Sequence, residues 1–123
     1  MPVLFRGVGA SPGKARGPIV LTSEAAVARA AEGPVLFRAD VHHEDMPGLR
    51  AAAAVVTTHG GVTGDGAIVA RALGKPCIAS ASGVRVDYMS RTVTVQRPGE
   101  PDRTLREGDV VTVDGATGEV SVD

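Results

Sequence analysis

The sequence predicts a single domain of the mixed α/β class, built from many short strands and two or three short helices. Its 123 residues are enough for one hydrophobic core but not for two. Short apolar runs bounded by glycine, proline or serine predict strands, and the last third alternates apolar and polar residues as half-buried strands do. The only aromatic residues are Phe5, Phe37 and Tyr88, so we expect a core of valine, alanine, leucine and isoleucine.

The N-terminal third predicts strands followed by a helix. Residues 2–22 indicate two strands joined by a loop of glycine, serine and proline. Residues 23–33 indicate a short helix, because Ser23 is a good N-cap residue and Gly33 a good C-terminal stop. Residues 34–38 follow as a compact apolar strand.

In the rest of the chain, predicted helices and strands follow one another less regularly. Residues 42–52 predict a short helical or turn segment that is interrupted at Pro47 and Gly48, and residues 52–58 predict a buried strand. Further strands are expected at three places, the last of them a hairpin that turns at residues 114–118. These strands cover residues 76–80, 91–96 and 108–123, with a turn at Pro98 and Gly99 before the hairpin.

Composition and charge exclude several function classes. The net charge is −1, and lysine and arginine are spread along the chain, so nothing predicts binding to nucleic acid or to an anionic membrane. Cys77 is the only cysteine, which excludes an intramolecular disulfide and a multi-cysteine zinc site. The first twenty residues lack the apolar core of a signal peptide, and no apolar run is long enough to span a bilayer. We therefore expect a cytoplasmic protein.

The stretch THGGVTGDGAIVARALGKPC, residues 58–77, combines a glycine-rich turn with a second predicted helix. The helix covers residues 66–73, with Ile68, Val69 and Leu73 on one buried face. Asp65 directly precedes it, where a carboxylate accepts an unpaired backbone N–H and interacts with the helix dipole by roughly 0.3–1 kcal/mol. Taken alone, these residues explain Asp65 as a helix N-cap with no further function.

The same stretch resembles the signature of the swivelling phosphohistidine domain of phosphoenolpyruvate (PEP)-utilising enzymes. The family pattern is close to G-G-x-T-[SC]-H-A-A-I-V-A-R-x-L-G-x-P-[AC]. The positions that match are Gly60, Gly61, Thr63, Ala67, Ile68, Val69, Ala70, Arg71, Leu73, Gly74, Pro76 and Cys77.

The resemblance extends over nearly the whole chain. The stretch ASPGKARGPIVLT is similar to the entry loop and strand of that domain, and LREGDVVTVDGATGEV is similar to its closing hairpin, most closely in the pyruvate phosphate dikinase version. The resemblance implies a single swivelling β/β/α phosphohistidine-type domain over residues 1–123, which we expect to stand alone.

In that family, the domain carries a phosphoryl group on the histidine of the motif and moves it between separate catalytic domains. Imidazole suits this role because it is nucleophilic near neutral pH, and the helix N-terminus helps to hold the phosphate. The sequence departs from the family here, because Thr63-Gly64-Asp65-Gly66 stands where the family has T-S-H-A. Asp65 therefore takes the position of the phosphoacceptor histidine.

The resemblance defines a candidate site around Asp65. The expected phosphate loop consists of Gly60, Gly61, Thr63, Gly64 and Gly66, and the expected supporting residues are Arg71 and His59. A carboxylate can form an acyl phosphate, but such chemistry commonly needs a metal ion and a cationic clamp to offset charge repulsion. The choice between a phosphorylated Asp65 and a helix cap stays open at this point.

A second departure lies at Val41-His42-His43, where the dikinase-like pattern reads T-S-P. With Glu44 and Asp45, these histidines form a dense cluster of potential ligands. Adjacent histidines point in different directions on a helix or a strand, so they rarely chelate one metal ion, and we expect no metal here.

Three hypotheses about function follow. The first is a non-catalytic homologue that docks on a separately encoded PEP/pyruvate-binding or ATP-grasp subunit. The second is a phosphocarrier subunit of a split phosphotransferase that uses Asp65 or a displaced histidine such as His59. The third is a module that binds an anion or small molecule at the helix N-terminus, where Gly64 and Gly66 leave room for the ligand. In each case we expect no cofactor on this chain, and Mg²⁺ and PEP only through a partner domain.

Overall fold

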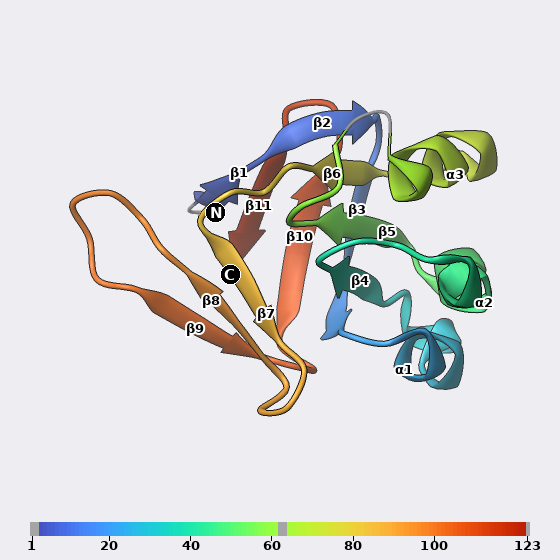
Figure 1. Ribbon diagram of the computed structural model, residues 1–123, viewed down its shortest axis with the longest axis horizontal. Helices are drawn as coiled ribbons and strands as arrows, with labels where there is room; N and C mark the ends of the chain where they lie inside the picture. The colour runs from blue at the N-terminus through green and yellow to red at the C-terminus, as the bar shows by residue number, and fades with distance from the viewer. Residues whose placement is uncertain (1–2, 62–63, 123) are drawn as a thin grey trace.

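The computed structural model describes residues 3–61 and 64–122, which form two sheets and three α-helices (Figure 1). The larger sheet has the strand order β1-β11-β10-β3-β4-β5-β6-β2, and the smaller sheet has the order β7-β8-β9. The strands are β1 (Val3–Arg6), β2 (Val8–Ser11), β3 (Lys14–Val20), β4 (Val35–Arg38), β5 (Ala54–Thr57), β6 (Cys77–Ala79), β7 (Val84–Asp87), β8 (Thr92–Val95), β9 (Arg103–Arg106), β10 (Val110–Asp114) and β11 (Glu119–Val122). The helices are α1 (Ser23–Ala28), α2 (Met46–Ala51) and α3 (Asp65–Leu73), with 3₁₀ turns η1 (Ala30–Glu32) and η2 (His43–Asp45).

The elements form three layers. The larger sheet lies in the middle, the three helices cover one face of its β3–β6 part, and the smaller sheet lies on the opposite side (Figure 1). Strands β3, β4, β5 and β6 run parallel, whereas the pairings of β1, β2, β10 and β11 are antiparallel. The mixed α/β class predicted from the sequence is confirmed.

Two hydrophobic clusters fill the spaces between these layers. The cluster between the two sheets is mainly valine and leucine, with Phe37 as its largest fully buried side chain, and Phe5 packs edge-on against it at 6.3 Å between ring centroids. The cluster under the helices is richer in alanine, including Ala26, Ala67 and Ala70. Small side chains on the helices allow them to lie close to the parallel strands.

Close backbone crossings join β2 to the β10–β11 hairpin. A Cβ atom on Gly115 would lie 1.8 Å from the Ser11 carbonyl oxygen, and one on Gly118 would lie 2.2 Å from the Gly7 carbonyl oxygen. Neither position therefore tolerates a larger residue. The hairpin predicted at residues 114–118 is confirmed, because the turn joins β10 to β11.

Three predictions about the N-terminal half are wrong in detail. The expected loop between the first two strands contains the strand β2, whose backbone pairs with β6. The N-cap of α1 is Thr22, whose hydroxyl accepts a hydrogen bond from the Ala25 amide at 3.1 Å, while the Ser23 hydroxyl accepts one from the Gly48 amide at 2.8 Å. Pro47 does not interrupt α2, because it lies in the first turn, where proline's missing N–H breaks no helical hydrogen bond.

The predicted buried face of the second helix is wrong for two of its three residues, since Val69 alone among them packs against the cluster under the helices. In α3 the buried residues are Gly66, Ala67 and Ala70, whereas the side chains of Ile68 and Leu73 are 50% and 41% exposed. The small residues face the sheet because α3 packs closely against β2, β5 and β6. No helix in the described part of the chain has the length and apolar character needed to cross a bilayer.

Candidate functional site

The candidate site lies where β5 ends and the chain turns toward α3. Hydrogen bonds fix the turn: the Thr57 hydroxyl donates to the Gly60 carbonyl at 3.0 Å, and the Ser80 amide donates to the same carbonyl at 2.8 Å. The His59 amide donates to the Ala39 carbonyl at 2.9 Å, which ties the turn to the end of β4. The site is thus at the carboxyl ends of parallel strands, where α/β sheets commonly bind ligands.

Helix α3 begins at Asp65, one residue earlier than predicted, and Gly64 is its N-cap. The prediction of Asp65 as the N-cap is therefore wrong. Asp65 lies in the first turn with an exposed side chain, and its carboxylate makes no hydrogen bond or ion pair with another described residue. At this position its charge interacts favourably with the helix dipole. Thr63 of the predicted phosphate loop lies outside the described residues.

A pocket of about 330 Å³ opens at this helix end. Two of its lining side chains are carboxylates, Asp40 and Asp65, and a third is the imidazole of His42. Among the described residues that line it there is no lysine or arginine. The full lining is Asp40, Val41, His42, Thr57, Gly60, Gly61, Gly64, Asp65 and Gly66. The structure thus brings together Asp65 and the described glycines of the predicted loop.

Packing requires one of the two glycines beside Asp65 and restricts the other. A Cβ atom on Gly66 would lie 2.8 Å from Cγ2 of Val41, and one on Gly64 would lie 3.1 Å from the Gly61 carbonyl oxygen. A side chain on Gly66 would therefore clash with Val41, and one on Gly64 would be tightly packed, although both glycines line the pocket.

The two predicted supporting residues lie away from this pocket. Arg71 donates a hydrogen bond to the Ala10 carbonyl at 2.9 Å, which anchors α3 to β2. His59 is exposed and lines a different pocket, beside β7. Sequence reasoning also missed Asp40, although its place just after the strand at residues 34–38 was a usable signal.

Within the cluster of residues 42–45, the aspartate has a structural role. Asp45 is buried, accepts a hydrogen bond from the His42 amide at 2.9 Å, and lies 3.6 Å from Nε of Arg38. Arg38 in turn donates to the Leu21 carbonyl at 3.0 Å, so this ion pair connects α2 to β3 and β4. Among residues 3–61 and 64–122, no group of three or more metal-binding side chains is arranged to hold a metal ion.

Two further titratable groups near α3 have shifted pKa values. Burial raises the pKa of the Cys77 thiol to about 11, so this side chain stays protonated and unreactive at neutral pH. Burial also lowers the pKa of Lys75, whose ammonium donates to the Arg50 and Ala52 carbonyls at the C-terminal end of α2. Both side chains contribute to the contacts between secondary-structure elements.

The comparisons with known proteins agree with this fold. The profile of the family "PEP-utilising enzyme, mobile domain" matches residues 30–118. The chain is 40% identical over 120 residues to pyruvate, phosphate dikinase of Rhizobium meliloti, covering 96% of this chain and 13% of that protein. It is also 40% identical over 122 residues to the chloroplastic pyruvate, phosphate dikinase 1 of Oryza sativa subsp. japonica, covering 98% of this chain and 12% of that protein.

A solved structure gives the same assignment. The NMR solution structure of an Enzyme I protein (nEIt) superposes with a TM-score of 0.50 and 26% identity, covering 75% of this chain and 31% of that chain. The curated relatives above are about eight times longer than this chain, since it covers only 12–13% of their length. The family profile and the dikinase relatives cover most of this chain, which therefore belongs to the family of PEP-utilising enzyme mobile domains.

Proposed function

We propose that this chain is a mobile-domain homologue that carries no phosphoryl group and acts as a docking or regulatory partner in a dikinase-like or phosphotransferase-like system. One observation carries the proposal: Asp65 has an exposed carboxylate in the first turn of α3. The family resemblance implies that this is the position of the motif's phosphoacceptor histidine. An aspartate lacks the imidazole nitrogen on which that family's chemistry depends.

The charge of the pocket supports this proposal. Asp40 and Asp65 both line it, and no cationic side chain does among the described residues. A phosphoryl group brings further negative charge, and transfer to a carboxylate commonly needs a metal ion or an arginine or lysine clamp. Arg71, the arginine of the same helix, donates to the Ala10 carbonyl instead. The site is therefore poorly suited to receive a phosphoryl group on Asp65.

We propose that the partner is a separately encoded subunit with a PEP/pyruvate-binding or ATP-grasp domain, which supplies Mg²⁺ and PEP. The dikinase relatives carry their matching segment within much longer chains, of which this chain covers 12–13%. In such enzymes, as the family resemblance implies, the domain meets its catalytic domains through the helix end that carries the motif. The docking surface proposed here is the same face, around Asp65.

The test is intact-mass analysis after incubation with Mg²⁺, PEP and a dikinase catalytic subunit from which its own swivelling domain has been removed. We expect no added phosphoryl group on the unchanged chain. The Asp65→His variant is the matched control, because the side chain at this position is exposed and the family motif has histidine there. We expect this variant to gain one phosphoryl group, on the introduced imidazole only.

Two results would contradict the proposal. A hydroxylamine-sensitive phosphoryl group on the unchanged chain would show that Asp65 is an acceptor and that the chain is a phosphocarrier. Absence of any complex with the same subunit, measured by sedimentation while a histidine-bearing mobile domain does bind it, would remove the docking role.

A further inference from the structure

A groove of about 390 Å³ lies between α1 and the start of α2. Both helices belong to the outer layer, on the side of the larger sheet away from the smaller one (Figure 1). The lining residues of α1 include pairs that are four positions apart, so they share one face of that helix. Those of the opposite wall are three positions apart and also share a face. The full lining is Ser23, Glu24, Val27, Ala28, Glu44 and Pro47.

The groove has an apolar floor and an acidic rim. Val27 is 51% exposed, and with the exposed side chains of Ala28 and Pro47 it forms an apolar surface that is open to solvent. Glu24 and Glu44, one on each wall, make no ion pair or side-chain hydrogen bond with another residue of the described ranges. Apolar surface between unpaired carboxylates favours an occupant that carries an apolar side chain beside a cation.

The turn between β7 and β8, residues 88–91, has the complementary character. It projects beyond the sheets at the lower edge of the view in Figure 1. Met89 in this turn is 96% exposed, and methionine adapts well to irregular apolar contacts. The guanidinium of the exposed Arg91 has no ion pair or hydrogen bond among residues 3–61 and 64–122. Glu107, which lines a pocket beside Arg91, accepts a hydrogen bond from the Leu21 amide at 3.0 Å instead.

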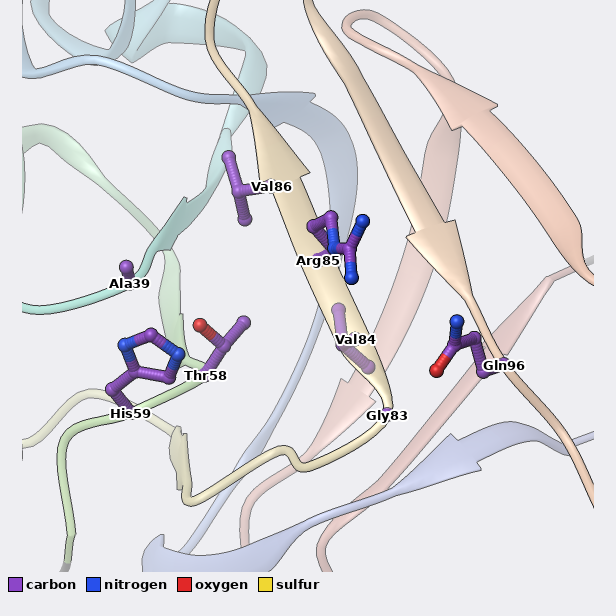
Figure 2. A pocket seen from close by; sticks show the side chains of 8 residues that line it. All are labelled: Ala39, Thr58, His59, Gly83, Val84, Arg85, Val86 and Gln96. Atoms are coloured by element: carbon purple, nitrogen blue, oxygen red, sulfur yellow. The ribbon is translucent and has the colours of Figure 1, made fainter.

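Hydrogen bonds restrain this turn. The Asp87 carboxylate accepts the amides of Met89 and Ser90 at 3.0 and 3.2 Å, so this acidic group is directed at its own turn. Ala39 lies beside β7 (Figure 2), and its amide donates to the Tyr88 hydroxyl at 3.0 Å, which ties the turn to the end of β4. A segment that is already ordered loses little conformational entropy when it binds.

We propose that the groove between α1 and α2 binds the β7–β8 turn of a second copy of this chain. Met89 of the second copy lies against Val27, and Arg91 beside it faces the two carboxylates of the rim. The contact is far smaller than a standard interface, so the association is weak, with a dissociation constant on the order of 0.1–1 mM. The inference does not depend on the proposed function, because neither Asp65 nor a phosphotransferase subunit enters it.

The contact joins different surfaces on the two copies, so each pair keeps one free groove and one free turn. Sedimentation equilibrium of the unchanged chain is therefore expected to show a mean mass that rises with concentration above the 12.5 kDa of one chain. Met89→Gln removes the apolar group of the turn, and Val27→Gln removes that of the groove. We expect each variant alone to associate at least about tenfold more weakly.

Mixing the two variants is the most specific test. The Met89→Gln chain keeps an intact groove and the Val27→Gln chain an intact turn, so together they form one contact and stop at a 1:1 pair. With the Met89→Gln chain ¹⁵N-labelled, we expect saturable NMR shifts of the Glu24, Ala28 and Glu44 amides when the Val27→Gln chain is added. An unlabelled chain that carries both changes is expected to cause no shifts.

The Ile68→Gln variant is the matched control for Val27→Gln. Ile68 is 50% exposed on α3 and does not line the groove, so we expect association within about twofold of the unchanged chain. Arg91→Gln tests the charge, and we expect it to weaken association about threefold, with less effect at high salt. A constant mass at every concentration, absence of shifts in the mixture, or equal losses in the Val27 and Ile68 variants would each overturn the proposal.

Discussion

At the scale of single residues, the surroundings of Gly66 show how packing determines the sequence around Asp65. Its missing side chain leaves space that Val41 fills, since a Cβ there would lie 2.8 Å from Val41 Cγ2. Val41 is buried and β-branched, so it cannot easily move aside. The glycine that follows Asp65 is therefore a packing requirement of this chain.

We predict that Gly66→Ala destabilises the chain by about 1 kcal/mol, because overpacking outweighs the better helix propensity of alanine. In a Val41→Ala background the same change is expected to cost clearly less, since the 2.8 Å contact is removed and the closest remaining atom is the residue-41 Cβ at 3.2 Å. Urea unfolding of the two single variants and the double variant measures this coupling. Gly61→Ala is the control, because a Cβ there would have no atom closer than 3.7 Å. Additive effects of the Gly66 and Val41 changes would contradict the explanation.

At the scale of elements, Lys75 connects the start of β6 to the end of α2. Its ammonium donates to the Arg50 and Ala52 carbonyls, which lack helical partners at the C-terminal end of α2. Burial lowers the pKa of Lys75, in keeping with its partly enclosed position. The family signature includes the Gly-x-Pro segment around this residue, but only the structure gives the lysine a role.

We predict that Lys75→Met lowers the free energy of unfolding by about 1–2 kcal/mol, because two carbonyls lose a charged donor while the apolar stem is kept. Hydrogen exchange of the Ala52 amide, which donates to the Gly48 carbonyl, is expected to become faster. Lys14→Met is the matched control, since Lys14 is the only other lysine and its 3.8 Å pair with Asp114 is largely exposed. Equal losses in the two variants would remove the proposed role of Lys75.

At the scale of the whole molecule, the β10–β11 hairpin connects the N-terminal strands to the rest of the sheet through close backbone contacts. Gly115 allows its backbone to lie against Ser11, and the absence of a side chain on Gly118 allows the contact with Gly7, whose amide donates to the Gly118 carbonyl at 2.8 Å. The crossing joins the first strands of the chain to the last, so its loss affects both hydrophobic clusters.

We predict that Gly115→Ala destabilises the molecule by at least about 3 kcal/mol or prevents folding, because the clash is with backbone that cannot rotate away. The neighbouring Ala116 is exposed, so Ala116→Ser is expected to change stability by less than about 0.5 kcal/mol. Circular dichroism during thermal unfolding compares the two. A stable, fully folded Gly115→Ala variant would mean that the crossing is looser than described.

Much of the fold followed from the sequence. The mixed α/β class and the hairpin at residues 114–118 were predicted because apolar periodicity and turn residues act over short distances. The helix expected over residues 23–33 is shorter, because α1 ends at Ala28 and Gly33 ends the 3₁₀ turn η1 that follows. The predictions that failed depended on long-range contacts. Strand β2 forms because β6 offers a partner, and α3 buries alanine because the sheet lies close beneath it.

The candidate site was likewise predictable from the sequence only in part. The sequence by itself determined the family resemblance, the glycine turn and the place of Asp65 at a helix end, because all of these lie within one continuous segment. Only the tertiary structure decided that Asp40 joins Asp65 and that His59 lies instead near Arg85 of β7. Residues far apart in the chain meet through sheet pairing and layer packing, and no local pattern encodes which of them become neighbours.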